Sequence, residues 1–317
     1  MRKIKIFAMI VTIGFIVLIV GIRLLHLVAS DNERERFPAP GDVVHINDAN
    51  MHVYSEGKGE TTIVFMSGGG TQAPTIDFKP LWSLLTDEYR IAVVEKPGYG
   101  WSEESDSPRT VEQMVAEMRE ALRLSGHRPP YVLAPHSMSG LEALYYASVY
   151  PEEVQAIVGL DPAVPKSYEQ LQVPSSIIIT GSGALSEFGG LRILPSFVKE
   201  ADIFSTAYLS TEDTKAYKSF IHRGTMTKNM REEIERVHEN AAVVSNQIPR
   251  ETPMLFFASN GQGTGIDDWR ETLNEYLHEI TDNELIEIDR SHYIHVYEPE
   301  QIAAEMKRFL YRLDEES

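Results

Sequence analysis

Short apolar runs alternate with stretches of helical periodicity along most of the chain beyond residue 42. The run Thr-Ile-Val-Phe-Met at 62–66 is rich in β-branched and apolar side chains, as expected for a strand buried on both faces. Similar runs predict strands at 43–46, 51–54, 90–95, 131–134, 154–160, 254–258 and 284–288. Helical periodicity predicts helices at 110–124, 140–150, 269–280 and 299–313. This alternation predicts an α/β fold with a mostly parallel central sheet and helices on both faces, opened by an antiparallel strand pair.

Residues 165–250 break this alternation. The segment contains a Gly-Ser-Gly stretch at 181–183, which we expect to be a loop, followed by two or three helices. We therefore predict a helical cap inserted between a first part of the core at 42–164 and a second part at 251–317. A cap of this kind usually covers a pocket.

The N-terminus has the composition of a membrane segment. Three cations within residues 1–5 precede an apolar run at 6–22, which is about 25 Å long as a helix. Flanking cations can reach the headgroups, so the run can span a bilayer core of about 30 Å. We predict a transmembrane anchor at 1–30 and a charged, proline-containing linker at 31–41.

The cations before the span favour a cytoplasmic N-terminus, which places the rest of the chain outside the cytoplasm. The small residues Val28, Ala29 and Ser30 leave a cleaved signal peptide, and hence a secreted protein, as the alternative.

The segment 131–140 brings together a strand, a serine and a predicted helix start. A nucleophile elbow needs compact residues two positions either side of its serine, because bulky ones would clash in the tight turn, and Ser137 meets this condition. The Met138 amide would then point toward a developing oxyanion. Ser139 fits less well, since a bulky leucine stands two positions after it, and Pro135 occupies a position where glycine is usual.

Charge and composition exclude several classes of function. The formal net charge of −18 repels phosphate backbones, so we expect no nucleic-acid partner. The chain has no cysteine, which removes disulfides, thiolate nucleophiles and cysteine-based zinc sites. The glycines at 261–265 lack the spacing of a dinucleotide or phosphate-binding loop, and no metal or organic cofactor is implied.

Further motifs follow one another in a fixed order. They are Ser-Gly-Gly-Gly at 67–70 after a strand, Glu-Lys-Pro-Gly-Tyr-Gly-Trp-Ser at 95–102, Leu-Asp-Pro-Ala at 160–163, and Ser-His-Tyr at 291–293 before Glu-Pro-Glu at 298–300. Together with the serine turn, they resemble the α/β-hydrolase superfamily from residue 43 to the C-terminus. The resemblance implies a serine hydrolase in which Gly69 and Met138 donate the oxyanion-hole amides and His292 is the base.

The third catalytic residue stays open at this point. The family's acid usually follows the strand at 254–258, but the loop after this strand has no carboxylate. Asp267 and Asp268 come later, where they would more often cap the next helix. We favour Asp161 at the end of the preceding strand, because some branches of the superfamily place the acid there. An uncharged residue such as Asn260 is a further alternative.

The sequence therefore predicts a serine hydrolase, esterase- or lipase-like or peptidase-like, acting on a small-molecule ester, thioester or amide through an acyl-enzyme. The rival prediction is a catalytically silent α/β-hydrolase fold that serves as a membrane-tethered binding or sensor module. The proline in the elbow and the missing acid after the usual strand support this rival.

Overall fold

Eight strands form one sheet in the order β1-β2-β4-β3-β5-β6-β7-β8 in the computed structural model, which describes residues 2–171, 173–193 and 202–316. The first two strands pair antiparallel, β2 pairs antiparallel with β4, and the strands from β4 to β8 run parallel. The strands are β1 (Asp42–Ile46), β2 (Ala49–Glu56), β3 (Thr62–Met66), β4 (Arg90–Val94), β5 (Tyr131–Ser137), β6 (Val154–Pro162), β7 (Met254–Ala258) and β8 (Asn283–Glu287). The predicted strands and the mostly parallel sheet are confirmed.

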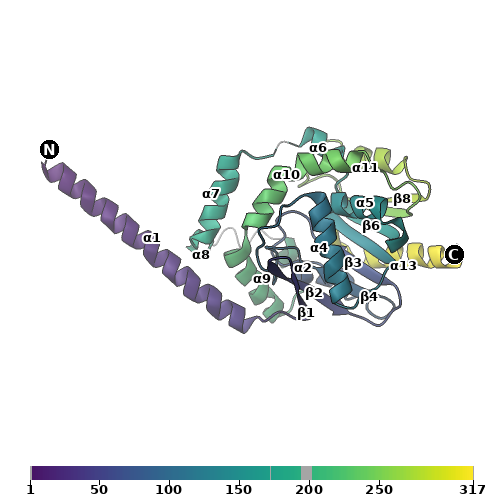
Figure 1. The fold of residues 1–317 in the computed structure, drawn as a ribbon, viewed down its shortest axis with the longest axis horizontal. Helices are drawn as coiled ribbons and strands as arrows, with labels where there is room; N and C mark the ends of the chain where they lie inside the picture. The colour runs from purple at the N-terminus through teal and green to yellow at the C-terminus, as the bar shows by residue number, and fades with distance from the viewer. Residues whose placement is uncertain (1, 172, 194–201, 317) are drawn as a thin grey trace.

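Helices cover both faces of this sheet (Figure 1). Side chains along a strand alternate between faces, so Val64 and Met66 of β3 pack toward one helical layer and Ile63 and Phe65 toward the other. The first layer holds α4 (Val111–Leu124), α5 (Gly140–Val149) and α11 (Trp269–Leu277). The second holds α3 (Lys79–Trp82), α12 (Ile294–Tyr297) and α13 (Pro299–Glu316). The short helices α2 (Pro74–Asp77) and η1 (Pro151–Glu153) lie in connections.

The segment predicted to be a cap follows β6, and the secondary-structure elements that the structure describes in it are all helices. It comprises α6 (Ser167–Gln170), α7 (Ser176–Glu187), α8 (Gly190–Ile193), η2 (Asp202–Ser205), α9 (Thr211–Gly224) and α10 (Lys228–Ser245). The expected loop at 181–183 was wrong, because these residues lie inside α7. Gly183 faces the guanidinium group of Arg231 on α10, where a side chain would overlap it, so packing favours a small residue in this helix.

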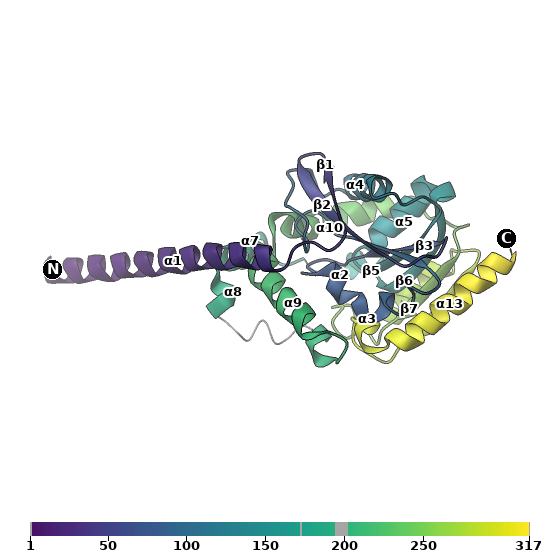
Figure 2. The same ribbon diagram turned by 90° about the horizontal axis from the view of Figure 1, so that it is seen from below.

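One continuous helix, α1 (Arg2–Arg36), precedes the sheet and projects away from the domain (Figures 1 and 2). Among the described residues, it is the one helix long and apolar enough to cross a membrane, with a mean hydropathy of 2.6 over an 18-residue stretch. The helix also runs through 31–36, within the linker expected at 31–41. Arg192 of α8 binds Glu33 at 2.7 Å and Ser30 at 3.0 Å, which holds this part of α1 against the cap.

Candidate active site

Ser137 stands at the end of β5 in a left-handed backbone conformation, with φ of 55°. This conformation is costly for a residue with a side chain, and at an elbow it lifts the side chain out of the sheet. The Ser137 carbonyl accepts a hydrogen bond of 2.8 Å from the Ala163 amide, which anchors the turn to the end of β6. Gly140 packs so closely on Ala163 that a β-carbon there would overlap its carbonyl oxygen. Small residues are therefore required around Ser137.

Ser139, the weaker nucleophile candidate, is fully buried. Its hydroxyl donates to the Met66 carbonyl at 2.7 Å and accepts from the His136 amide at 3.1 Å. These bonds tie the turn to β3, so the Ser139 hydroxyl has a structural role.

Asp161 and His292 lie together although 131 residues separate them. The Nδ1 atom of His292 is 2.6 Å from Oδ2 of Asp161. Oδ1 of Asp161 accepts two further bonds, from the Ser259 amide at 2.7 Å and from the Trp269 indole at 2.6 Å. The carboxylate is completely buried and is held by three donors when the imidazole carries its proton on Nδ1.

The other acid candidates lie elsewhere. Asp267 and Asp268 are exposed, and neither has a hydrogen bond or ion pair with His292 among the interactions of the described residues. Asp268 occupies the N-cap position of α11 without capping it through its side chain. The Asn260 side chain binds Asp289 and the Gln262 amide instead of the histidine.

Two backbone amides near Ser137 are candidates for an oxyanion hole, one in the loop after β3 and one in the elbow itself. Gly69 and Met138 are neighbours, because a β-carbon on Gly69 would lie 2.8 Å from Cε of Met138. Among the described residues, neither amide donates a hydrogen bond within the protein. Gly68 brings this loop against the elbow, since a β-carbon there would lie 2.7 Å from Cβ of Ser137. Both amides are thus available to a bound oxyanion.

A cavity of about 250 Å³ joins these groups. Ser137, His292, Gly68 and Gly69 line it together with residues of the cap and the following loops. These other lining residues are His136, Ala163, Ser167, Tyr168, Leu171, Gly263, Thr264, Ile266, Trp269 and Tyr293. Within the described chain, Ser137 and His292 are not hydrogen-bonded to each other, which is common when no substrate is bound.

His136 contacts the loop that carries His292. Its Nε2 atom lies 3.2 Å from the His292 carbonyl, and its ring centroid is 4.7 Å from that of His292. Burial, followed by the nearby His292 and His295, holds the pKa of His136 well below its ordinary value. A neutral ring that donates from Nε2 leaves Nδ1 as an acceptor, and this buried atom has no partner.

Sequence reasoning missed the two donors that hold Asp161. Ser259 directly follows the strand at 254–258, so its amide could have been expected at the same sheet edge as Asp161. Trp269 comes ten residues later at a helix start, and nothing in the sequence marks its indole as a partner of this carboxylate.

A buried charged cluster ties the cap to the core beside the cavity. The ammonium group of Lys96 binds Glu142 of α5 and Glu233 of α10, each at 2.8 Å, and Tyr99 donates to Glu233 at 2.7 Å. Burial opposes the charge on Lys96, but the two carboxylates hold its pKa well above the ordinary value. In the part of the chain that the structure describes, no group of three or more histidine or carboxylate side chains could hold a metal ion.

Known proteins share this architecture. A family model described as the alpha/beta hydrolase fold matches residues 61–176. YbdG of Bacillus subtilis (strain 168) is 32% identical over 301 residues, which cover 92% of this chain and 93% of that protein. A pimeloyl-(acyl-carrier protein) methyl ester esterase of Stenotrophomonas maltophilia is 25% identical over 181 residues, covering 56% of this chain and 65% of that protein. The solved epoxide hydrolase of Vigna radiata matches with a TM-score of 0.65 at 16% identity, covering 86% of this chain and 97% of that one. The chain therefore belongs to the α/β-hydrolase superfamily.

Proposed function

We propose that this protein is a membrane-anchored serine hydrolase that cleaves an ester, thioester or amide bond. The observation that carries the proposal is the 2.6 Å contact between His292 and Asp161 in the cavity where Ser137 stands on its strained turn. A buried carboxylate that holds an imidazole in the same cavity as a half-buried serine is the arrangement that activates a serine nucleophile.

In the proposed mechanism, the Ser137 hydroxyl attacks the acyl carbonyl while Nε2 of His292 accepts its proton. Asp161 holds the imidazole in the tautomer with a free Nε2 and stabilises the imidazolium that forms. The amides of Gly69 and Met138 donate to the oxyanion. His292 then gives its proton to the leaving group, and the acyl-enzyme is hydrolysed by a water that His292 deprotonates.

The size of the cavity favours a short acyl group. Its volume of about 250 Å³ is below the roughly 300–1,000 Å³ of most small-molecule pockets, and Tyr168, Leu171 and Ile266 contribute apolar side chains to a lining that is otherwise largely polar. An ester substrate also agrees with the esterase relative from Stenotrophomonas maltophilia.

The proposed location follows from α1. Most apolar side chains at 6–22 are exposed in the structure, as a bilayer span requires, and the preceding cations favour an extracytoplasmic domain. Cleavage near Ser30 would instead release the domain as a secreted protein.

A fluorophosphonate probe tests the chemistry on the full chain in detergent. We expect labelling of the wild type, loss of labelling in Ser137→Ala, and retained labelling in Asp268→Asn, the matched surface control. A panel of p-nitrophenyl esters should then show turnover that falls as the acyl chain lengthens. Absence of both labelling and turnover in the folded wild type would refute the enzyme and leave the tethered binding module.

A further inference from the structure

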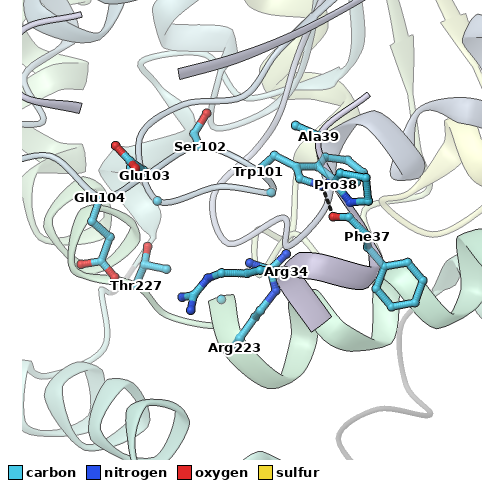
Figure 3. A pocket seen from close by; sticks show the side chains of 13 residues that line it. Arg34, Phe37, Pro38, Ala39, Trp101, Ser102, Glu103, Glu104, Arg223 and Thr227 are labelled. Carbon is cyan, nitrogen blue, oxygen red and sulfur yellow. Dashed lines mark hydrogen bonds between the residues drawn. The ribbon is translucent and has the colours of Figure 1, made fainter. Parts of the chain in front are cut away.

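Two adjoining cavities lie between the C-terminal part of α1, the cap and the loop after β4, away from the candidate active site. Their volumes are about 470 and 450 Å³. They share four lining residues: Arg34, Glu104, Arg223 and Thr227. Figure 3 shows the guanidinium groups of Arg34 and Arg223 beside each other in the first cavity.

The second cavity carries an excess of positive charge on a strongly acidic protein. Five cations line it, namely Arg23, Arg34, Arg223, Lys228 and Arg231, against the two carboxylates Glu104 and Glu187. The formal net charge of the whole chain is −18, so the positive charge of this cavity is opposite in sign to that of the protein as a whole. A cavity with this charge attracts anions.

Three of the cations already have acidic partners. Arg23 lies 3.8 Å from Glu187, Arg34 binds Asp31 at 3.0 Å, and Lys228 pairs with an aspartate outside the cavity. No carboxylate of the described residues lies within ion-pair distance of Arg223 or Arg231. These two guanidinium groups are therefore the ones free to bind a ligand.

The surroundings of Arg223 are unfavourable for a guanidinium group without an acidic partner. Its Nε atom is buried and has no hydrogen-bond partner, and its guanidinium carbon lies 4.3 Å from the centre of the Phe220 ring. Burial, together with the neighbouring Arg34, lowers the pKa of Arg223 to about 10. A partly buried cation without an anionic partner is costly, so an anion bound in the cavities that Arg223 lines would offset its charge.

Arg231 approaches the same cavity from α10. Its Nη1 atom donates to the Met226 carbonyl at 2.6 Å, which fixes the orientation of the planar group. Gly183 of α7 leaves the room for it, since a β-carbon would overlap the guanidinium. The cavity thus has two oriented guanidinium groups, from α9 and α10.

The position of the cavity indicates which anion can reach it. Arg23 and His26 of α1 line it directly after the apolar run at 6–22, and α7 and α8 lie beside this part of α1 (Figures 1 and 2). These two helices also present apolar side chains to solvent. Ile177 is 84% exposed and Ile178 is 64% exposed, and Phe188 and Ile193 are exposed as well. If 6–22 spans a bilayer, this surface lies at the headgroup region.

We propose that the cavity between α1 and the cap binds a phosphate group, and that the phosphate belongs to the headgroup of an anionic lipid. Arg223 and Arg231 bind the phosphate oxygens through their N–H groups, with Arg23 and Arg34 adding charge. The apolar residues of α7 and α8 contact the acyl region beside it. The lipid source rests on the proposed anchor, whereas the anion site does not depend on the proposed catalytic residues.

Thermal unfolding of the full chain in an uncharged maltoside detergent tests this site. The additives are dihexanoyl phosphatidylglycerol, dihexanoyl phosphatidylcholine and inorganic phosphate. We expect saturable stabilisation by phosphatidylglycerol, none by phosphatidylcholine, and inorganic phosphate to act only at concentrations at least tenfold higher. Arg223→Gln and Arg231→Gln should each weaken the phosphatidylglycerol effect at least tenfold.

Arg236→Gln is the matched control, because Arg236 lies on the same helix α10 and pairs on the surface with Glu232 and Glu239. It should leave lipid binding unchanged. Equal stabilisation by the two lipids would overturn the site, as would unchanged binding in Arg231→Gln, which decides the matter if Arg223→Gln fails to fold. Equal potency of inorganic phosphate would overturn the lipid as the source. Fluorophosphonate labelling, measured in parallel, reports the catalytic proposal separately.

Discussion

Replacement of Asp161 by asparagine tests the candidate site at its most constrained point. The carboxylate is fully buried, and its Oδ1 atom already accepts bonds from the Ser259 amide and the Trp269 indole. Both of these groups can only donate, so the oxygen of the new amide must face them. Its NH₂ group is then directed at Nδ1 of His292, where Oδ2 stood at 2.6 Å.

This orientation forces the wrong imidazole tautomer. Nδ1 of His292 must accept from the new amide, so the proton moves to Nε2, which can no longer accept a proton from Ser137. The same substitution of the acid in a serine protease triad lowers turnover about 10⁴-fold, or roughly 5.5 kcal/mol in the barrier. We expect a loss of that order in Asp161→Asn. The fold should change little, because the Ser259 amide and the Trp269 indole keep their acceptor and His292 adapts by changing tautomer.

The assay is the rate of fluorophosphonate labelling together with turnover of a short p-nitrophenyl ester. Asp267→Asn and Asp268→Asn are the matched controls and should stay within about twofold of the wild type, since both aspartates are exposed and make no contact with His292. Circular dichroism should show that each variant is folded. Turnover of folded Asp161→Asn within about tenfold of the wild type would show that this carboxylate does not orient the base.

Three further outcomes follow from the structure. Gly68→Ala should lower turnover by roughly 100-fold or more, because the new β-carbon overlaps Ser137 and displaces an oxyanion donor. Gly69→Ala should lower turnover far less, because its β-carbon contacts only the flexible side chain of Met138. Lys96→Met should lower the free energy of unfolding by about 3–5 kcal/mol in denaturant titrations at neutral pH, because it leaves the charges of two buried glutamates without their cation. Since the folded state keeps His136 neutral, the unfolded chain gains its proton first as the pH falls below about 6.5. This difference lowers the free energy of unfolding by up to roughly 1.4 kcal/mol for each unit that the pH falls. His136→Gln should remove this contribution to the pH dependence of stability between about pH 6.5 and 5.5.

The core could be predicted from the sequence because its strands are encoded locally. The run at 62–66 is buried along its whole length, and its residues alternate between the two helical layers as the pattern indicates. The turn at Ser137 could likewise be predicted from its neighbours in sequence, although contacts with Ala163 and Met66 also hold it in the fold.

The sequence favoured Asp161 as the acid but left Asp267, Asp268 and Asn260 as alternatives, because the choice depends on how distant strand ends meet. Asp161 reaches His292 through the pairing of β6 with β7, which also brings Ser259 and Trp269 to the same carboxylate. Asp267 is close to the usual position in sequence, yet the loop exposes it to solvent.

Long-range packing also overrode a local signal in the segment predicted to be a loop. The Gly-Ser-Gly stretch at 181–183 has poor helix propensity, but Gly183 leaves room for Arg231 against α7. The charged residues at 31–36 have the composition of a linker, and in the structure they continue α1, where Glu33 binds Arg192.

The unbroken course of α1 matters for how the protein is released or shortened. His26 and Ser30 are buried against the cap, and the Arg192 side chain binds both of them. A peptidase cut after Ser30 would remove these contacts along with the apolar run, so the shortened chain would lose the support that α1 gives to the helices after β6. A shortened version that lacks the apolar run but keeps the contacts of His26 and Ser30 with Arg192 should begin at about Arg23.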